Sequence, residues 1–408
     1  MLSRALGLKR SSPKIEIQLK GEENGPKDSY TTGSVVEGTV VITMPQNLPL
    51  GTVAIFFQGI SQVRFYRAIN HGRSKTQHTF LSLRQPPDEM KLPTPRISKK
   101  GQQYKFPFSF IIPEKLPPRS CSHFTQSEQI ENSHRKLPAT FGDRGCSLAI
   151  DGFASAMTCV SYRIRVKLST PLSTEVLLTE TRCVPVIPTA LEEPPVEVEG
   201  NSLYLTQRNI SLGKGLSGSQ SGQLSVEVVQ PKPVQLPSFG EGAHNNASTV
   251  ATMKLEYVGV ANPPMLRSIS SGLSVITMYS ATPWVNRPDM IYPSSFGHGN
   301  RGMHRDELPL SKLCIESVEW TRQPLTSPNQ DMCPQSPVDR SDPPFMTYRY
   351  TASIVVPVTL PKTIFAPTFH SCFVSRVYLV NLSLCYHTNG LGLLNSNSCL
   401  RVPLQIIN

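Results

Sequence analysis

Short apolar runs with a period of two residues constrain this chain more than any other feature. Lys14–Leu19 places Ile15, Ile17 and Leu19 on one face of an extended segment, with polar residues between them. The same alternation returns across Cys159–Leu168, and no segment sustains the 3.6-residue period of an amphipathic helix. Such runs are typical of half-buried antiparallel strands. The chain is therefore predicted to be all-β.

Proline usage supports this prediction, because 37 prolines are scattered among the apolar runs. Proline interrupts helices and cannot donate to a strand ladder, so it favours short strands joined by turns. A chain of 408 residues is long enough for two domains of ordinary size. We expect two antiparallel β-sandwich lobes in tandem, with long disordered loops.

The first half is predicted to begin with a basic arm, residues 1–13, which lacks the apolar core of a secretory signal. A first sandwich follows at residues 14–188. It contains a polar stretch rich in Ser, His and Arg at about 117–148. Because this stretch is too long for an ordinary connection, we expect a disordered insertion there.

The second half is predicted to follow a linker, residues 189–222, which is acidic and Pro-rich at its start and Gly- and Ser-rich at its end. A second sandwich then spans residues 223–408. Two stretches rich in Pro, Gly or Asp, at about 283–310 and 322–345, are expected to be loops. No apolar run reaches the 18 residues of a candidate membrane-spanning helix.

The two halves contain the same succession of motifs. Phe108–Pro117 ends in Pro-x-x-Leu-Pro and precedes the alternating segment Val160–Leu168. Ala352–Pro361 has the same ending and precedes the alternating segment Val374–Leu384. Proline is expected to end the first strand of each pair, because it cannot donate to a ladder. Two tandem copies of one β unit are the simplest explanation.

Two further motifs are Tyr30–Val41, which contains Val-x-Gly-x-Val, and the final Leu400–Ile406. Together with the repeated motifs of the two halves, they make the chain resemble the arrestin family. The second half is most similar to the α-arrestins that regulate fungal plasma-membrane transporters. The resemblance implies two β-sandwich lobes and a non-enzymatic adaptor. Such an adaptor binds cytosolic regions of plasma-membrane transporters or receptors and promotes their ubiquitination, endocytosis and sorting. It is cytoplasmic and associates peripherally with the plasma membrane or endosomes.

One family feature is missing. Many α-arrestins bind a HECT-type ubiquitin ligase through Pro-Pro-x-Tyr, but no Pro-Pro pair in this sequence has Tyr two residues later. Recruitment of the ligase is then indirect or absent. The alternative is an arrestin-fold trafficking or coat scaffold of the retromer-like type, without direct ligase recruitment.

The formal net charge of +11 fits an anionic partner such as an acidic membrane surface or a phosphorylated peptide. Nucleic acid is not among the expected partners. Arg163, Arg165 and Lys167 alternate with apolar residues and therefore project from one strand face, about 7 Å apart. This row either binds phosphate or acidic side chains or is a solvated outer face.

Two further groups of residues are candidates for binding or structural roles. Arg96, Lys99 and Lys100 lie in an expected loop and either contact anionic lipid or are solvated. Arg376 and Tyr378 alternate along one strand, so they share a face. A buried or interface arginine needs a carboxylate or carbonyl partner, so this pair is expected to have a structural role between the lobes.

No motif indicates catalysis or a metal. The chain has no P-loop, no GxSxG elbow and no HExxH, and His298 and His304 in a Gly-rich stretch are not expected to bind metal. Nine cysteines without a CxxC pair indicate reduced core thiols. We expect no catalytic residues, no metal and no cofactor. A secreted adhesion-type sandwich would require disulfides, and a hydrolase would require converging titratable groups.

Overall fold

The protein is described by a computed structural model. The residues that the structure describes are 12–22, 29–47, 51–67, 72–86, 97–143, 152–169, 176–190, 192, 196, 198–214, 220–237, 247–260, 262–289, 300–325, 347–387 and 396–408. Their regular structure is nearly all β, in several antiparallel sheets, as predicted.

The first half forms two antiparallel sheets. The strands of the three-stranded sheet, in spatial order, are β1 (Lys14–Leu19), β2 (Val35–Thr43) and β5 (Gln103–Ile111). The strands of the four-stranded sheet are β4 (Gly72–Arg84), β3 (Val53–Arg67), β6 (Thr158–Ser169) and β7 (Val176–Val184). Between β5 and β6 lie a 3₁₀ turn, η2 (Pro118–Ser120), and the single described α-helix, α1 (Glu128–His134).

The second half also forms two main sheets. The first contains β14 (Thr321–Pro324), β15 (Tyr348–Thr359), β11 (Ser248–Gly259), β9 (Gln220–Val229) and β8 (Gln207–Lys214). The second contains β13 (Arg301–Cys314), β12 (Met265–Ser280), β17 (Val374–His387) and β16 (Phe369–His370), and β18 (Ser396–Leu404) also pairs with β17. A short parallel pair joins β10 (Val234–Gln235) to β19 (Ile406–Ile407).

Alternating burial explains why these segments are strands. Ile15, Ile17 and Leu19 of β1 face the core while their neighbours are exposed, as predicted. On β6 the buried residues are Tyr162, Ile164, Val166 and Leu168, also as predicted, and they join the same core. Burying one face of each sheet against the other is what stabilises a sandwich.

The two halves share one strand order. In the first half β2 pairs with β1 and β5, β3 pairs with β4 and β6, and β6 pairs with β7. In the second half β11 pairs with β9 and β15, β12 pairs with β13 and β17, and β17 pairs with β18. These are the corresponding pairs. The register shift in the hairpin also recurs, at Gly59 of β3 and at Gly272 of β12. A side chain at Gly59 would meet the Phe80 ring, because an added Cβ would lie 2.3 Å from it.

Prolines stand where a missing N–H is tolerated. Pro107 lies on β5 and Pro309 on β13, and each of these strands is at the edge of its sheet. The prediction that proline ends the repeated strand is right for β5, which stops before Pro113. It is wrong for β15, which continues through Pro357. There β15 has a described neighbour on one side only, opposite Val250, so the ladder loses nothing at that proline.

The predicted disordered insertion at 117–148 is wrong for residues 117–143, which are described and partly buried. Leu137, Ala139 and Phe141 belong to the core of the first half. Ser127 caps α1 by accepting a hydrogen bond from the Ile130 N–H. The sequence pattern did not predict an ordered segment, because the segment is polar and is held by individual contacts and not by a periodic apolar face.

Three other predicted boundaries also change. The linker 189–222 contains β8 and the start of β9, so the second half takes up its sheet at Gln207 and not at residue 223. The expected loop 283–310 contains the first ten residues of β13, and the loop 322–345 begins within β14. The arm is outside the described residues except for 12 and 13.

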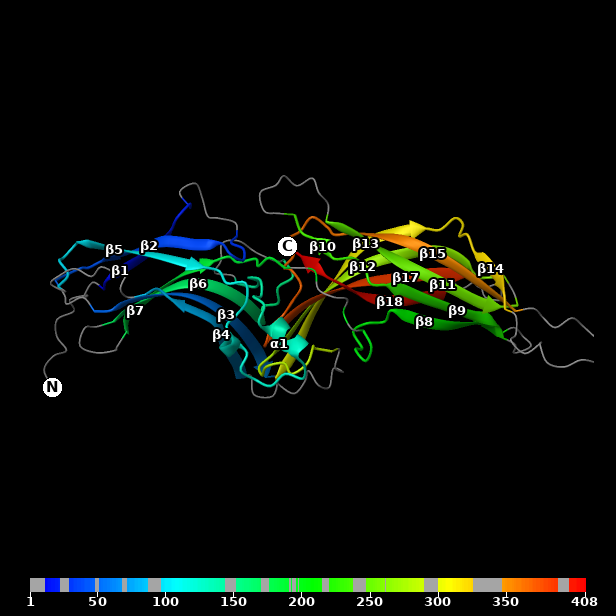
Figure 1. Cartoon of the computed structure of the whole chain (residues 1–408), viewed down its shortest axis with the longest axis horizontal. Coiled ribbons are helices and arrows are strands. Elements are labelled where there is room, and N and C mark those ends of the chain that lie inside the picture. Colours follow the sequence, from blue (N-terminus) through cyan, green and yellow to red (C-terminus); the bar gives the residue numbers. More distant parts are fainter. Residues whose placement is uncertain are drawn as a thin grey trace, which may run out of the picture.

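One apolar core crosses between the two halves. Figure 1 shows β1–β7 at one end of an elongated molecule and β8–β18 at the other, with α1 between them. The core of the first half includes Tyr279, Phe369, Phe373 and Val374 of the second half. Strand β12 begins with alternating burial, whereas its last residues are buried on both faces. A small apolar cluster that includes Ile276 and Met278 covers the face that points away from the core of the first half.

Buried tyrosines hold the connections of both halves to their sheets. Tyr162 of β6 donates to the Pro138 carbonyl (2.7 Å), and Tyr378 of β17 donates to the Ala366 carbonyl (2.5 Å).

Tyr162→Phe leaves the buried Pro138 carbonyl unsatisfied, which costs about 1–3 kcal/mol. We expect the thermal midpoint, measured by circular dichroism, to fall by about 2–4 °C for each kcal/mol lost.

The control for this prediction is Tyr348→Phe, at a half-buried position where water can replace the protein as a partner. An equal midpoint for Tyr162→Phe and the wild type would show that the hydroxyl does not hold the connection.

Candidate functional site at the junction of the two halves

Arg376 lies at the junction and is completely buried. Its guanidinium donates to Thr277 Oγ1 of the neighbouring strand β12 and to the Phe153 carbonyl of the first half (3.4 Å). It also lies over the rings of Phe141 (5.6 Å) and Tyr378 (5.8 Å). Burial lowers the pKa of Arg376, because removing the charge from water is costly. The two hydrogen bonds and the two ring contacts offset part of that cost. The carbonyl partner that the sequence required comes from the other half of the chain.

Tyr378 shares the buried face with Arg376. Burial raises its pKa to about 12, so the hydroxyl is neutral near pH 7 and remains a hydrogen-bond donor. Both residues hold elements together and reach no solvent. The structure therefore places this pair in the scaffold of the site and not on its surface.

Four pairs of rings that include a Phe or Tyr side chain join the halves at the junction, in addition to the pair formed by His134 and His370. Centroid distances are 5.5 Å for Phe65 and Tyr279, 4.8 Å for His78 and Phe373, 5.6 Å for Phe141 and Phe369, and 5.3 Å for Phe153 and Phe365. Each pair has one member from each half. Such pairs contribute about 0.5–1.5 kcal/mol each beyond the area they bury. The junction is therefore an extended contact and not a single hinge.

A groove of about 440 Å³ opens beside this junction. Both halves and the linker line it, and its apolar floor includes Leu137 and Phe369. Lys115, Lys136 and Arg287 stand around it with a single acid, Glu114. None of these lining residues was singled out from the sequence, because they come from four separate segments.

A cluster of sulfur and nitrogen ligands adjoins the groove. Cys121, His123, His134 and Cys372 each offer one ligand atom, and these four atoms lie within 4.8 Å of one another. Cys121 Sγ is 3.3 Å from His123 Nε2 and 3.6 Å from His134 Nδ1. His134 Nε2 lies 3.1 Å from Nε2 of His370, which lines the groove. These are the described residues that could hold a metal ion.

The protonation of this cluster follows from its burial. Burial raises the pKa values of the Cys121 and Cys372 thiols and lowers that of His134 to about 4. It also lowers the pKa of His370 well below its usual range. Near pH 7 both thiols and both imidazoles are therefore neutral. Sequence reasoning could have found only Cys-x-His at 121–123, because Cys372 is far away in the chain.

The predicted cationic row on β6 lies on the outer face of the four-stranded sheet. Arg163 is already engaged in an ion pair with the nearly buried Asp143 (2.9 Å). Lys167 lies over the Phe56 ring (5.6 Å), and Arg84 of β4 lies over the same ring (5.9 Å). Arg165 is directly opposite Phe56 in the register. Arg84, Arg165, Lys167 and Phe56 therefore form one surface, called the cationic face below.

The second predicted cationic group lies elsewhere. Lys99 and Lys100 are exposed in the turn before β5, where their backbone N–H groups donate to the Tyr104 hydroxyl (2.9 Å) and to Asn47 Oδ1 (2.8 Å). This turn adjoins the three-stranded sheet, whereas the cationic face belongs to the four-stranded one. Arg96 lies outside the described residues.

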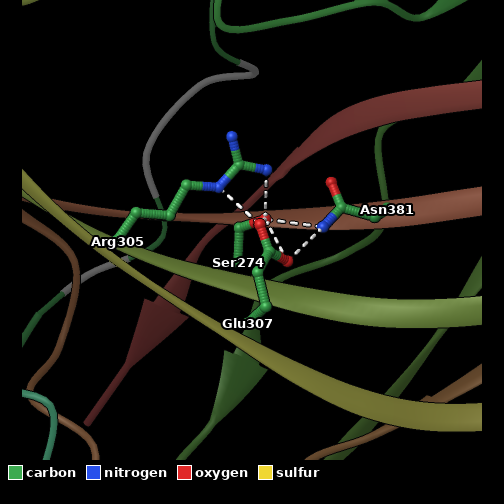
Figure 2. Close-up of polar contacts among 4 residues, drawn as sticks. All are labelled: Ser274, Arg305, Glu307 and Asn381. Atoms are coloured by element: carbon green, nitrogen blue, oxygen red, sulfur yellow. Dashed lines mark hydrogen bonds and ion pairs between the residues drawn. The ribbon is translucent and has the colours of Figure 1, made fainter.

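A polar network crosses three strands of the second half (Figure 2). The buried Ser274 hydroxyl on β12 donates to Glu307 on β13 (2.9 Å) and accepts from Asn381 on β17 (2.5 Å). Arg305 donates to Ser274 (3.0 Å) and also pairs with Glu307. The Glu307 carboxylate thus accepts hydrogen bonds from Ser274, Arg305 and Asn381. The network joins three neighbouring strands beside the register shift at Gly272 and fixes their register. We therefore interpret it as a structural contact and not as a reaction centre.

No protein-family model matches the chain, and no curated protein matches it with significant similarity. Within the described ranges, no helix is long and apolar enough to cross a bilayer.

Arg376→Ala should be strongly destabilising, because it removes contacts with two rings and leaves a cavity and unsatisfied partners across the junction. We expect a loss of about 3–5 kcal/mol in the free energy of unfolding. Arg376→Met fills most of the volume without a charge and should cost less. Urea unfolding followed by tryptophan fluorescence measures both.

The matched control is Arg349→Ala, which removes a half-exposed ion pair with Glu256 and should cost less than about 1 kcal/mol. A similar loss in Arg376→Ala and Arg349→Ala would contradict a stabilising role at the junction.

Proposed function

We propose that this chain is a non-enzymatic adaptor of the arrestin type. It binds cytosolic regions of plasma-membrane transporters or receptors and promotes their ubiquitination, endocytosis and sorting. The observation that carries the proposal is the repeated strand order of the two halves, fused by one apolar core into an elongated unit (Figure 1). This arrangement agrees with the order of motifs that the chain shares with arrestins.

The cationic face is the proposed docking surface. Its cations project from strands and not from loops, so little conformational freedom is lost when a partner binds. The Arg84 guanidinium and the Lys167 ammonium lie over the Phe56 ring, and Arg165 is opposite Phe56 in the strand register. Arginine binds phosphate and carboxylate in bidentate geometry, so this surface fits an acidic or phosphorylated cytosolic segment.

A cytoplasmic, peripherally membrane-associated protein is part of the same proposal. The seven cysteines in the described ranges are free thiols, as expected in a reducing compartment. The net positive charge favours approach to the anionic inner leaflet. Since the sequence has no Pro-Pro-x-Tyr motif, a HECT-type ligase would reach the cargo through a second adaptor.

A coat or trafficking scaffold of the retromer-like type is the second candidate. The missing ligase motif favours it, and so does the extended junction, which suits a constitutive structural subunit. In this case the stable partners are other coat subunits, and no ligase takes part.

The test is proximity labelling in the native cell with the full chain as bait. The variant Arg84→Glu, Arg165→Glu and Lys167→Glu reverses the cationic face. The control Lys254→Glu, Arg267→Glu and Lys312→Glu makes the same charge change on exposed residues of the second half. We expect the wild type and the control to label plasma-membrane transporters and a ubiquitin ligase, and the face variant to lose most of the transporter signal.

Equal labelling of transporters by all three proteins would reject the cationic face as the docking surface. Recovery of a fixed set of endosomal coat subunits without transporters would reject the cargo adaptor in favour of the scaffold.

A further inference from the structure

We propose that Cys121, His123, His134 and Cys372 bind one Zn²⁺ ion, which fastens the connection between β5 and β6 to the second half of the chain. This site is independent of the proposed adaptor function. It lies beside the aromatic junction and uses three residues from the first half and one from the second.

The spacing of the ligand atoms fits a tetrahedral ion. Zinc bonds of about 2.3 Å to sulfur and 2.0–2.1 Å to nitrogen place a sulfur and a nitrogen about 3.6 Å apart in a tetrahedron. Cys121 Sγ lies 3.3 Å from His123 Nε2 and 3.6 Å from His134 Nδ1. These two separations match those around a bound ion, and all four ligand atoms lie within 4.8 Å of one another.

The outer nitrogen of each histidine has a partner: for His123 it is a backbone carbonyl, as is common for metal-bound histidines, and for His134 it is a neighbouring imidazole. Nδ1 of His123 lies 3.0 Å from the Phe124 carbonyl and donates to it, which leaves the Nε2 lone pair for the metal. Nε2 of His134 lies 3.1 Å from His370 Nε2, so donation there leaves the Nδ1 lone pair for the metal. In both residues the nitrogen that faces Cys121 is therefore the free ligand atom.

The ligand types select zinc. Two thiolates and two imidazoles suit Zn²⁺, whereas Ca²⁺ and Mg²⁺ require oxygen ligands. Binding of Zn²⁺ releases the protons of the Cys121 and Cys372 thiols to solvent. The two resulting thiolates balance the charge of the divalent ion, so the buried site is neutral when loaded. Four protein ligands leave no position for a substrate. The site is consequently structural and not catalytic.

The position of the ligands explains what the ion would hold. His134 is the last residue of α1, which has seven residues and is too short to be stable alone. Cys121 and His123 precede this helix, and Cys372 lies in the tight turn between β16 and β17. Zinc would therefore tie both ends of the α1 segment to the strand that carries Arg376.

The experiment uses full-length protein purified under reducing conditions without a polyhistidine tag. Metal content is measured by inductively coupled plasma mass spectrometry, and Co²⁺ is then substituted for spectroscopy. We expect about one Zn²⁺ per chain and, with Co²⁺, thiolate charge-transfer and tetrahedral d–d absorption. Removing the ion with a chelator should lower the thermal midpoint by at least about 5 °C, and restoring Zn²⁺ should reverse this.

Variants locate the ion. Cys372→Ser and His123→Ala should lose the metal, whereas the controls Cys399→Ser and His304→Ala, at partly or fully exposed positions, should keep it. His370→Ala retains all four ligands and should weaken zinc affinity about 10–100-fold. Because the wild-type metal content and Co²⁺ spectrum are measured first, a variant that fails to fold does not leave the question open.

Three outcomes would overturn the site. The wild type could lack metal and give no thiolate–Co²⁺ band. The metal could persist in Cys372→Ser at the wild-type level, which would place it elsewhere. Mass spectrometry could show a Cys121–Cys372 disulfide in the protein from the native cell. The two sulfurs would then be bonded to each other and could not bind a metal ion.

Discussion

The structure depends on one continuous apolar contact between its halves, in which Arg376 is enclosed. If each half buried only its own core, the two sandwiches would be free to move on their linker. Instead, β12 and β17 extend beyond their own core, and their ends are packed by residues of the first half. The charge of Arg376 is tolerated there because ring faces, a hydroxyl and a carbonyl replace its water. The groove and the Cys/His cluster, which take residues from both halves, depend on this contact.

Local pattern was enough to predict strands such as β1 and β6 but not the junction. The alternation from Tyr162 to Leu168 is a property of neighbouring residues, and it survives in the fold because one face of the sheet is buried. The junction instead pairs residues such as Phe141 and Phe369, which are distant in the chain and belong to segments without periodicity. The α1 segment was predicted to be disordered for the same reason, since its order comes from individual contacts with distant residues of both halves, such as Phe80 and His370.

The candidate surface sites show the same division. Alternation placed Arg163, Arg165 and Lys167 on one face, and the structure agrees. It gave no information on Asp143, which occupies Arg163, or on Phe56 and Arg84, which come from other strands and define the cationic face. The Cys/His cluster was not predicted, because Cys-x-His at 121–123 is a weak signal alone and Cys372 comes from the second half of the chain. Metal-ligand motifs can be found in a sequence only when the ligands are close in the chain.

The connection between β5 and β6 raises a thermodynamic question that the junction alone does not answer. Fixing each residue of an irregular segment costs about 1–2 kcal/mol of conformational entropy. Residues 117–136 bury few apolar side chains, Leu116, Cys121 and Ile130 being the described exceptions around them. Capping by Ser127 and about two turns of helix cannot offset such a cost. A tetrahedral ion with ligands at both ends of this segment would supply the missing free energy, because binding to a site that exists only in the folded state is itself folding free energy.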